Sequence, residues 1–401
     1  MGPGLPWSFK EGRDLARPNV VMILVDDLGW TDLGCYGNEL HDTPMLDRLA
    51  QEGTRFTNAY ASAPNCSPTR SAILTGHSPA TLNITDYIPG RDVPHAELKP
   101  PEGRHQLPTS PPTLAARLGK VGYTSISIGK WHLGEDEALP TNRGFSESVS
   151  PGPNRQESMY PPYGVPGLDD APDDLYLTDR LSQAAQRFIR ENADQPFLLY
   201  LPHYAIHRPH EAKPDLLAKY RERLPDDEED RAVYAAMVEA LDQSTRRIVD
   251  TLRDEGVWSN TILFFTSDNG PTDVSRPRPL RAGKGTLYEG GLRVPLITTG
   301  YYHGIRNRVR DRRYPSDQSR PPCHGARLGE RYARRISRGG ESPTIVAKSD
   351  GTVPRDALLA LPALLLARAA PRRRHPTGAI QAHRLSPLHR GGALRSGTRY
   401  Q

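Results

Sequence analysis

Four stretches of the chain are rich in apolar or β-forming residues and end in polar side chains. They are residues 19–27 (NVVMILVDD), 123–132 (YTSISIGKWH), 196–207 (PFLLYLPHYAIH) and 261–270 (TILFFTSDNG). Continuous apolar runs of this length are typical of parallel strands that are covered on both faces. The pattern therefore predicts an α/β fold with a mostly parallel central sheet between helices.

Amphipathic segments lie between the apolar runs. Thr43 and Pro44 are typical of an N-cap followed by proline at the first helical position, and Gly53 is a stop signal. Residues 175–192 and 231–255 carry apolar side chains at helical spacing, which predicts two longer helices packed on the core. The proline-rich residues 87–112 and 151–172 are predicted to be long loops above the sheet that shape a substrate pocket.

The ends of the four predicted strands carry candidate chemistry. In open α/β sheets ligands bind just outside the carboxyl ends of the strands. Polar residues follow most buried strands, so one such end indicates little, but four ends with compatible chemistry indicate a site. The residues delivered to this edge would be Asp26, Asp27, Lys130, His132, His207, Asp268 and Asn269.

Four of these residues offer only oxygen donors. Asp26, Asp27 and Asp268 are carboxylates, and Asn269 is an amide. Hard oxygen ligands suit Ca²⁺ or Mg²⁺ and suit zinc or copper poorly. The set therefore predicts a site for one hard cation, either Ca²⁺ or Mg²⁺.

Three sequence motifs resemble signatures of the sulfatase family. Residues 66–70 (CSPTR), followed by Leu-Thr-Gly at 74–76, match the Cys-x-Pro-x-Arg activation motif. Residues 129–134 (GKWHLG) and 283–291 (GKGTLYEGG) resemble two further signatures of that family. A five-residue motif alone carries a real risk of a chance match. Together with the strand ends, the three motifs identify a sulfatase-like hydrolase from about residue 18 to residue 295.

The resemblance implies how the nucleophile is made. In that family a maturation enzyme oxidises the motif cysteine, here Cys66, to formylglycine, whose aldehyde hydrates to a diol. One hydroxyl attacks the sulfur of a sulfate ester, and the second expels sulfate afterwards. The resemblance also implies that Asp26, Asp27, Asp268 and Asn269 hold calcium.

The remaining site residues take their roles from the same resemblance. Lys130 and Lys284 would grip the sulfate, and Arg70 would hold the diol in position. His207 would help to protonate the departing alcohol, and His132 would take a proton as the diol collapses. His203 and His210 match nothing in the family pattern, and we interpret them as local surface or structural histidines.

The family resemblance implies an alkaline-phosphatase-like fold, a central mixed sheet flanked by helices, in a catalytic domain of residues 18–300. One alternative is a two-zinc phosphohydrolase of the same superfamily, but that enzyme would have an Asp-His pair where this chain has Asp268 and Asn269. Another alternative is a catalytically inactive, truncated or frameshifted product.

Residues 301–401 differ in composition from the rest of the chain. They contain 20 Arg, one Lys and six acidic residues, a charge of +15, whereas the first 300 residues carry −10. Clustered arginine is typical of phosphate binding, but the near-total replacement of lysine by arginine favours a frameshifted segment over a nucleic-acid arm. We therefore expect a missing or garbled C-terminal subdomain, a sheet without its last family strand, and a poorly ordered tail.

Composition and the N-terminal residues limit which cellular compartment and which partners we expect. The three cysteines, Cys35, Cys66 and Cys323, give no disulfide framework, and no run approaches the ~18 apolar residues of a membrane span. Residues 1–19 lack the apolar core of a secretory signal, which predicts a cytoplasmic protein as written and an exported one if the true start lies upstream. The expected partners are a sulfated small molecule or carbohydrate and a maturation enzyme, with no nucleic acid.

Overall fold

The first apolar run forms β1 (Asn19–Val25), a strand whose seven residues are all buried. Val21, Ile23 and Val25 pack in one hydrophobic core, and the residues between them pack in a second core on the opposite face. A strand buried on both faces must lie inside a sheet that is covered by helices. This explains why its sequence is continuously apolar and does not alternate.

The computed structural model describes residues 17–91, 94–95, 97, 102–151, 156–168, 172–275 and 277–300. Within them lies a seven-stranded sheet of order β2-β7-β6-β1-β5-β3-β4. The other strands are β2 (Thr54–Tyr60), β3 (Thr124–Ile128), β4 (Glu147–Val149), β5 (Phe197–Pro202), β6 (Thr261–Ser267) and β7 (Arg293–Gly300). β7 pairs antiparallel with both of its neighbours, and the other pairs are parallel. The expected mixed, mostly parallel sheet is confirmed.

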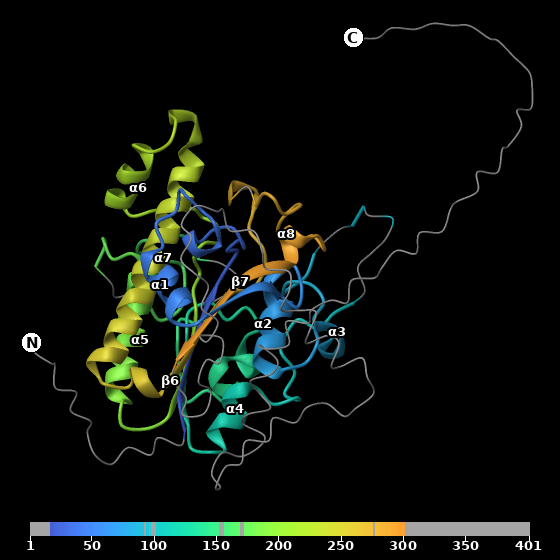
Figure 1. Cartoon of the computed structure of the whole chain (residues 1–401). Helices are drawn as coiled ribbons and strands as arrows, with labels where there is room; N and C mark the ends of the chain where they lie inside the picture. The colour runs from blue at the N-terminus through green and yellow to red at the C-terminus, as the bar shows by residue number, and fades with distance from the viewer. Residues whose placement is uncertain are drawn as a thin grey trace, which may run out of the picture. The chain divides into compact units, whose positions relative to one another are not determined.

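Helices cover both faces of the sheet (Figure 1). The long helices α5 and α7 lie with α1 on one face, and α2 and α4 lie on the other. The helices are α1 (Pro44–Glu52), α2 (Cys66–Thr75), α3 (Pro79–Leu82), α4 (Leu114–Gly119), α5 (Leu177–Glu191), α6 (Pro214–Arg221), α7 (Glu229–Asp254) and α8 (Glu289–Leu292). The three predicted helices are therefore present, with ends shifted by one or two residues.

Helix α1 begins at Pro44 as expected, but Thr43 does not cap it. The Thr43 hydroxyl instead donates to Asp47 at 3.1 Å and accepts from the amide of Gly34. The free amides at the start of α1 donate to the buried carboxylate of Asp242 on α7, from Met45 at 3.1 Å and from Leu46 at 2.8 Å. The capping group therefore comes from a residue almost 200 positions away, which local sequence signals do not reveal.

The sheet extends further than the sequence predicted. The expectation that it lacks a further strand after residue 295 is wrong, because residues 293–300 form β7 between β6 and β2. The edge strands β2 and β4 were also not predicted, because they are only partly buried and lack a continuous apolar run. The predicted tail, residues 301–401, lies outside the described residues.

The two predicted loops contain no helix or strand in their described parts. No helix in the described ranges is long and apolar enough to span a membrane.

Candidate active site

Four parallel strands deliver the candidate residues to one edge of the sheet. β6, β1, β5 and β3 are consecutive neighbours, all parallel, so their carboxyl ends lie side by side. Asp26 and Asp27 follow β1, and Asp268 and Asn269 follow β6, the strand paired with it. Their proximity is therefore a direct consequence of strand pairing.

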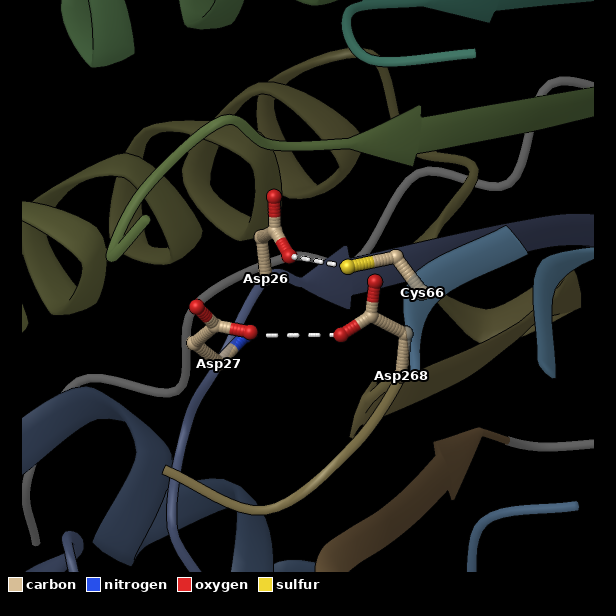
Figure 2. Close-up of side chains that lie close together, drawn as sticks. All are labelled: Asp26, Asp27, Cys66 and Asp268. Atoms are coloured by element: carbon tan, nitrogen blue, oxygen red, sulfur yellow. Dashed lines mark hydrogen bonds between the residues drawn. The ribbon is translucent and has the colours of Figure 1, made fainter. Parts of the chain in front are cut away.

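Cys66 reaches this edge from a helix. It is the first residue of α2, and its thiol donates a hydrogen bond to Asp26 Oδ1 at 3.4 Å. Figure 2 shows Cys66 facing Asp26, Asp27 and Asp268. One ligand atom from each of these four residues lies within 4.8 Å of the others. The cluster is completely buried, so its charges interact with little screening by solvent.

Cationic side chains compensate the buried carboxylates. Lys130 Nζ binds Asp26 and lies 3.8 Å from Cys66 Sγ. Arg70, one helical turn after Cys66, contacts Asp268 Oδ2 through Nε at 2.8 Å and through its second terminal nitrogen at 2.7 Å. Arg70 also donates to the carbonyl of Lys130 at 2.6 Å, which ties α2 to the end of β3.

The side chain of Asp27 lies next to the remaining candidate residues of the site. Lys284 Nζ lies 2.6 Å from Asp27 Oδ1, and His207 Nε2 lies 4.0 Å from Oδ2. Asn269 Nδ2 donates to Asp27 Oδ1 at 2.7 Å. Asp27 has a left-handed backbone (φ 68°), which is uncommon for a residue other than glycine and turns the chain sharply after β1.

The buried charges shift the acidity of the site. Burial alone would raise the pKa of Asp26, but Lys130, followed by His207 and Arg70, holds it well below its ordinary value. Burial and the neighbouring charge of Asp26 raise the pKa of Asp268 to about 6. Although burial acts against its charge, Asp27 raises the pKa of the Lys284 ammonium. The site thus holds fixed positive charge beside the carboxylates.

The same environment makes the Cys66 thiol unreactive. Burial, reinforced by the charge of Asp26, raises its pKa far above the usual thiol value. The thiolate is the nucleophilic form of cysteine, and its population at neutral pH is negligible here.

His132 is held as a neutral base. Its Nε2 lies 2.7 Å from the carbonyl oxygen of Ile88, which can only accept, so Nε2 carries the proton. Burial and the charge of Lys130 lower its pKa well below the ordinary value. Nδ1 is buried with no partner among the described residues, which leaves its lone pair free.

The donor set fits a hard cation. Apart from Cys66, the clustered ligand atoms are carboxylate oxygens, and Asn269 Oδ1 is buried without a partner in the described part of the chain. A buried acceptor left without a donor is unfavourable unless a ligand or ion satisfies it. Oxidation of Cys66 to formylglycine would replace the single sulfur with oxygen, so all donors would then suit Ca²⁺ or Mg²⁺.

The structure brings all ten predicted residues to this edge. It also places the two histidines that were interpreted as surface or structural residues. His203 is fully buried and hydrogen bonds to Ser244 at 3.2 Å, so it is structural and not on the surface; burial lowers its pKa to about 3. His210 is half-buried against the ring of Tyr234.

The missed residue is Asp32. Its carboxylate accepts from Gly29 N, Tyr234 Oη and Ser275 Oγ, each at 2.6 Å, and so fixes the turn after Asp27. An acidic residue seven positions beyond the end of β1 was the only signal in the sequence, and it does not reveal these partners.

Known proteins resemble this chain in sequence and in structure. The family model described as Sulfatase matches residues 18–314. Human N-acetylgalactosamine-6-sulfatase is 35% identical over 307 residues, which cover 70% of this chain and 56% of that protein. Human arylsulfatase A is 34% identical over 327 residues, covering 72% of this chain and 60% of that protein. The chain thus spans somewhat more than half the length of these curated relatives.

A solved structure has the same architecture. The crystal structure of Ps i-CgsB in complex with k-i-k-neocarrahexaose is 31% identical, with a TM-score of 0.61, and covers 71% of this chain and 66% of that chain.

Proposed function

Because the chain belongs to the sulfatase family, we propose that it hydrolyses sulfate esters through a formylglycine nucleophile made from Cys66 and one bound Ca²⁺. The observation that carries this proposal is the buried cluster of Cys66 with three carboxylates and three cations, Arg70, Lys130 and Lys284. Such a cluster presents fixed positive charge to an anionic group while it holds a metal.

The state of Cys66 supports conversion of this residue. A buried thiol with a raised pKa cannot supply a thiolate at neutral pH. Formylglycine at this position would supply a diol, one hydroxyl of which attacks sulfur while the other later expels sulfate. Arg70, on the same face of α2, would hold the hydroxyls in place.

Four residues would hold the metal: Asp26, Asp27, Asp268 and Asn269, the last through its unpartnered Oδ1. When bound, the ion acts as a Lewis acid toward a sulfate oxygen and lowers the pKa of the attacking hydroxyl. Lys130 and Lys284 contact these carboxylates in the present structure and would turn toward the sulfate oxygens, where negative charge develops in the transition state.

Two histidines would move protons. His132 would accept a proton at Nδ1, because its Nε2 proton is already donated to Ile88. His207 would protonate the departing alcohol. Burial lowers the pKa of His207 in the free site, and the negative charge of a bound sulfate ester would act in the opposite direction and favour the protonated ring.

A sulfated carbohydrate is the substrate class that the similar proteins favour. One relative is named for N-acetylgalactosamine 6-sulfate chemistry, and one solved structure holds a carrageenan-type hexasaccharide. A formylglycine-generating enzyme would be the maturation partner.

The test is coexpression of the full chain with a formylglycine-generating enzyme, followed by mass spectrometry of the Cys66 peptide and assay of sulfate ester hydrolysis. We expect a thiol-to-aldehyde mass loss, turnover that depends on it, and no turnover in Cys66→Ala. Cys66→Ser should retain a covalent sulfate, because a serine sulfate lacks the second hydroxyl that expels it. Full activity of Cys66→Ala, or two tightly bound zinc ions with phosphatase activity, would refute the proposal.

A further inference from the structure

A cavity of about 390 Å³ lies at the carboxyl edge of the sheet, outside the catalytic cluster. Its walls are the loop after β1, the start of α7 and the loop after β6, and none of the ten candidate site residues lines it. A volume of this size lies in the lower part of the range of small-molecule sites. The charged, imidazole and aromatic side chains that line it are Trp30, Tyr36, Glu39, His41, Arg231, Tyr234 and Arg278, and Glu39 is exposed.

Hydrogen bonds of Asp32 and Asn38 fix the walls of the cavity. Asp32 ties Tyr234 and Ser275 together, as described above, so α7 and the loop after β6 share one buried anchor. Asn38 Oδ1 accepts from the amides of Leu40 and His41 at 2.9 and 2.8 Å, which fixes the loop after β1. A ligand would therefore meet a preformed site and would lose little free energy in ordering it.

The cavity offers one neutral acceptor. His41 Nδ1 lies 2.9 Å from the carbonyl oxygen of Asp32, which can only accept, so Nδ1 carries the proton. Burial lowers the pKa of His41, so the ring is neutral at pH 7 and Nε2 is left as an acceptor. A neutral acceptor of this kind suits a hydroxyl group of a ligand.

The cavity also offers positive charge and aromatic surface. Arg278 is exposed and makes no ion pair or hydrogen bond with another residue of the described ranges. Arg231 is half-buried and pairs with Glu228. Trp30 packs edge-to-face on Tyr36, with ring centroids 5.2 Å apart. Arg293 lies over the Trp30 ring at 4.3 Å, so these aromatic side chains form a wall of the cavity and not an open stacking platform. An exposed arginine for an anion and a neutral acceptor for a hydroxyl, beside this wall, together match an anionic carbohydrate.

We propose that this cavity is a second binding site, which takes an acidic ring of a sulfated carbohydrate chain while the catalytic cluster takes the ester to be cleaved. Tyr234 Oη lies 3.3 Å from the carbonyl oxygen of Asp27, and Ser275, Arg278 and Lys284 belong to one loop, so the two sites share a wall. A purely apolar ligand would leave Nε2 of the buried His41 without a hydrogen-bond partner. The choice of a sulfated chain rests on the proposed function.

The test uses the full-length Cys66→Ala protein, which cannot turn over, and two sulfated hexasaccharides as probes, one of the carrageenan type and one built on N-acetylgalactosamine. Dissociation constants are measured by calorimetry, and tryptophan fluorescence reports where the probe binds. We expect Arg278→Ala to weaken binding by about twofold to fivefold, as for an exposed ion pair, and Arg278→Glu to weaken it further.

Two matched control variants test whether a change in affinity or fluorescence arises at the cavity. Arg281 lies on the same loop but stacks on Tyr288 at 3.8 Å, so Arg281→Ala and Arg281→Glu should leave the affinity unchanged. Trp258 precedes β6, at the opposite end of the strands, and carries Arg253 on its ring as Trp30 carries Arg293. Trp30→Phe should abolish the probe-induced fluorescence change, and Trp258→Phe should retain it.

The outcomes separate this inference from the proposed function. Hydrolysis of a small aryl sulfate by the matured protein, with hexasaccharide affinity unchanged in both Arg278 variants, overturns the cavity proposal alone. Loss of affinity in the Arg278 variants of a protein that hydrolyses no sulfate ester supports the cavity and refutes the enzyme proposal. A fall in melting temperature without a change in affinity would show that Arg278 is structural and would also overturn the cavity proposal.

Discussion

The carboxylate of Asp242 should make the stability of the protein depend on pH in an unusual direction. It caps α1 from α7, and burial raises its pKa to about 6, partly offset by the amides of Leu46 and Met45. The folded state therefore binds the Asp242 proton more tightly than the unfolded state, whose carboxyl has a pKa near 3.9. Between these values the contribution of Asp242 to the free energy of unfolding falls as pH rises.

The size of this pH dependence follows from the shift in the pKa of Asp242. A difference of about two pKa units corresponds to roughly 3 kcal/mol over the full range, of which about 2 kcal/mol lies between pH 4.5 and pH 7.5. Asp242→Asn removes the titration while it keeps one acceptor for the helix amides. The unfolding free energy of the wild type minus that of the variant should therefore be larger at pH 4.5 than at pH 7.5 by this amount.

Urea unfolding at a series of pH values measures this difference, since other titrating groups cancel between the two proteins. The matched control is Asp250→Asn, the same substitution on the same helix at a side chain that is 53% exposed. Its difference from the wild type should not vary by more than a few tenths of a kcal/mol. Parallel pH profiles for the wild type and Asp242→Asn would refute the assignment of a raised pKa to this cap.

Three further predictions concern the catalytic edge. Lys284→Ala should lower kcat of the matured protein by about 100-fold or more, as removal of a preorganised group that stabilises transition-state charge does; an unchanged kcat would exclude this role. Calcium at 100 times its dissociation constant should stabilise the wild type by about 2.7 kcal/mol in a thermal unfolding assay, and Asp27→Ala should lose this stabilisation while it remains folded. His203→Ala should destabilise the fold by about 2–4 kcal/mol because it leaves a buried cavity, with unchanged kcat per folded molecule; a catalytic loss in the folded protein would contradict its structural assignment.

Charge balance connects these predictions. Three buried carboxylates, Asp26, Asp27 and Asp268, face three cations, Arg70, Lys130 and Lys284. Each lysine contact shields a carboxylate that the metal would otherwise bind. Metal binding and substrate binding should therefore support each other, because a sulfate group gives the lysines a new anionic partner when the ion takes over the carboxylates.

The sequence by itself determined the parallel sheet core and the identity of the candidate residues. A strand buried on both faces is commonly a continuous apolar run, so β1, β5 and β6 were visible without a structure. β3 was visible as a segment rich in β-forming residues, although three of its five residues are Thr or Ser. Because parallel strands end at one edge, the residues that follow them could be assigned to one site. Cys66 lies on α2 and does not follow a strand. Only the resemblance of its motif to the sulfatase activation motif predicted that it belongs to this site.

Only the tertiary structure decided which atoms meet. The pairing of Lys284 with Asp27, the capping of α1 by Asp242 and the anchoring of Tyr234 by Asp32 each join residues about 200 or more positions apart. The partly buried strands β2 and β4, and β7 beyond residue 295, also depend on their neighbours for recognition. Periodicity and capping rules describe contacts within one helix or strand, whereas these contacts exist only when distant elements pack against one another. The same packing creates the cavity beside the catalytic edge.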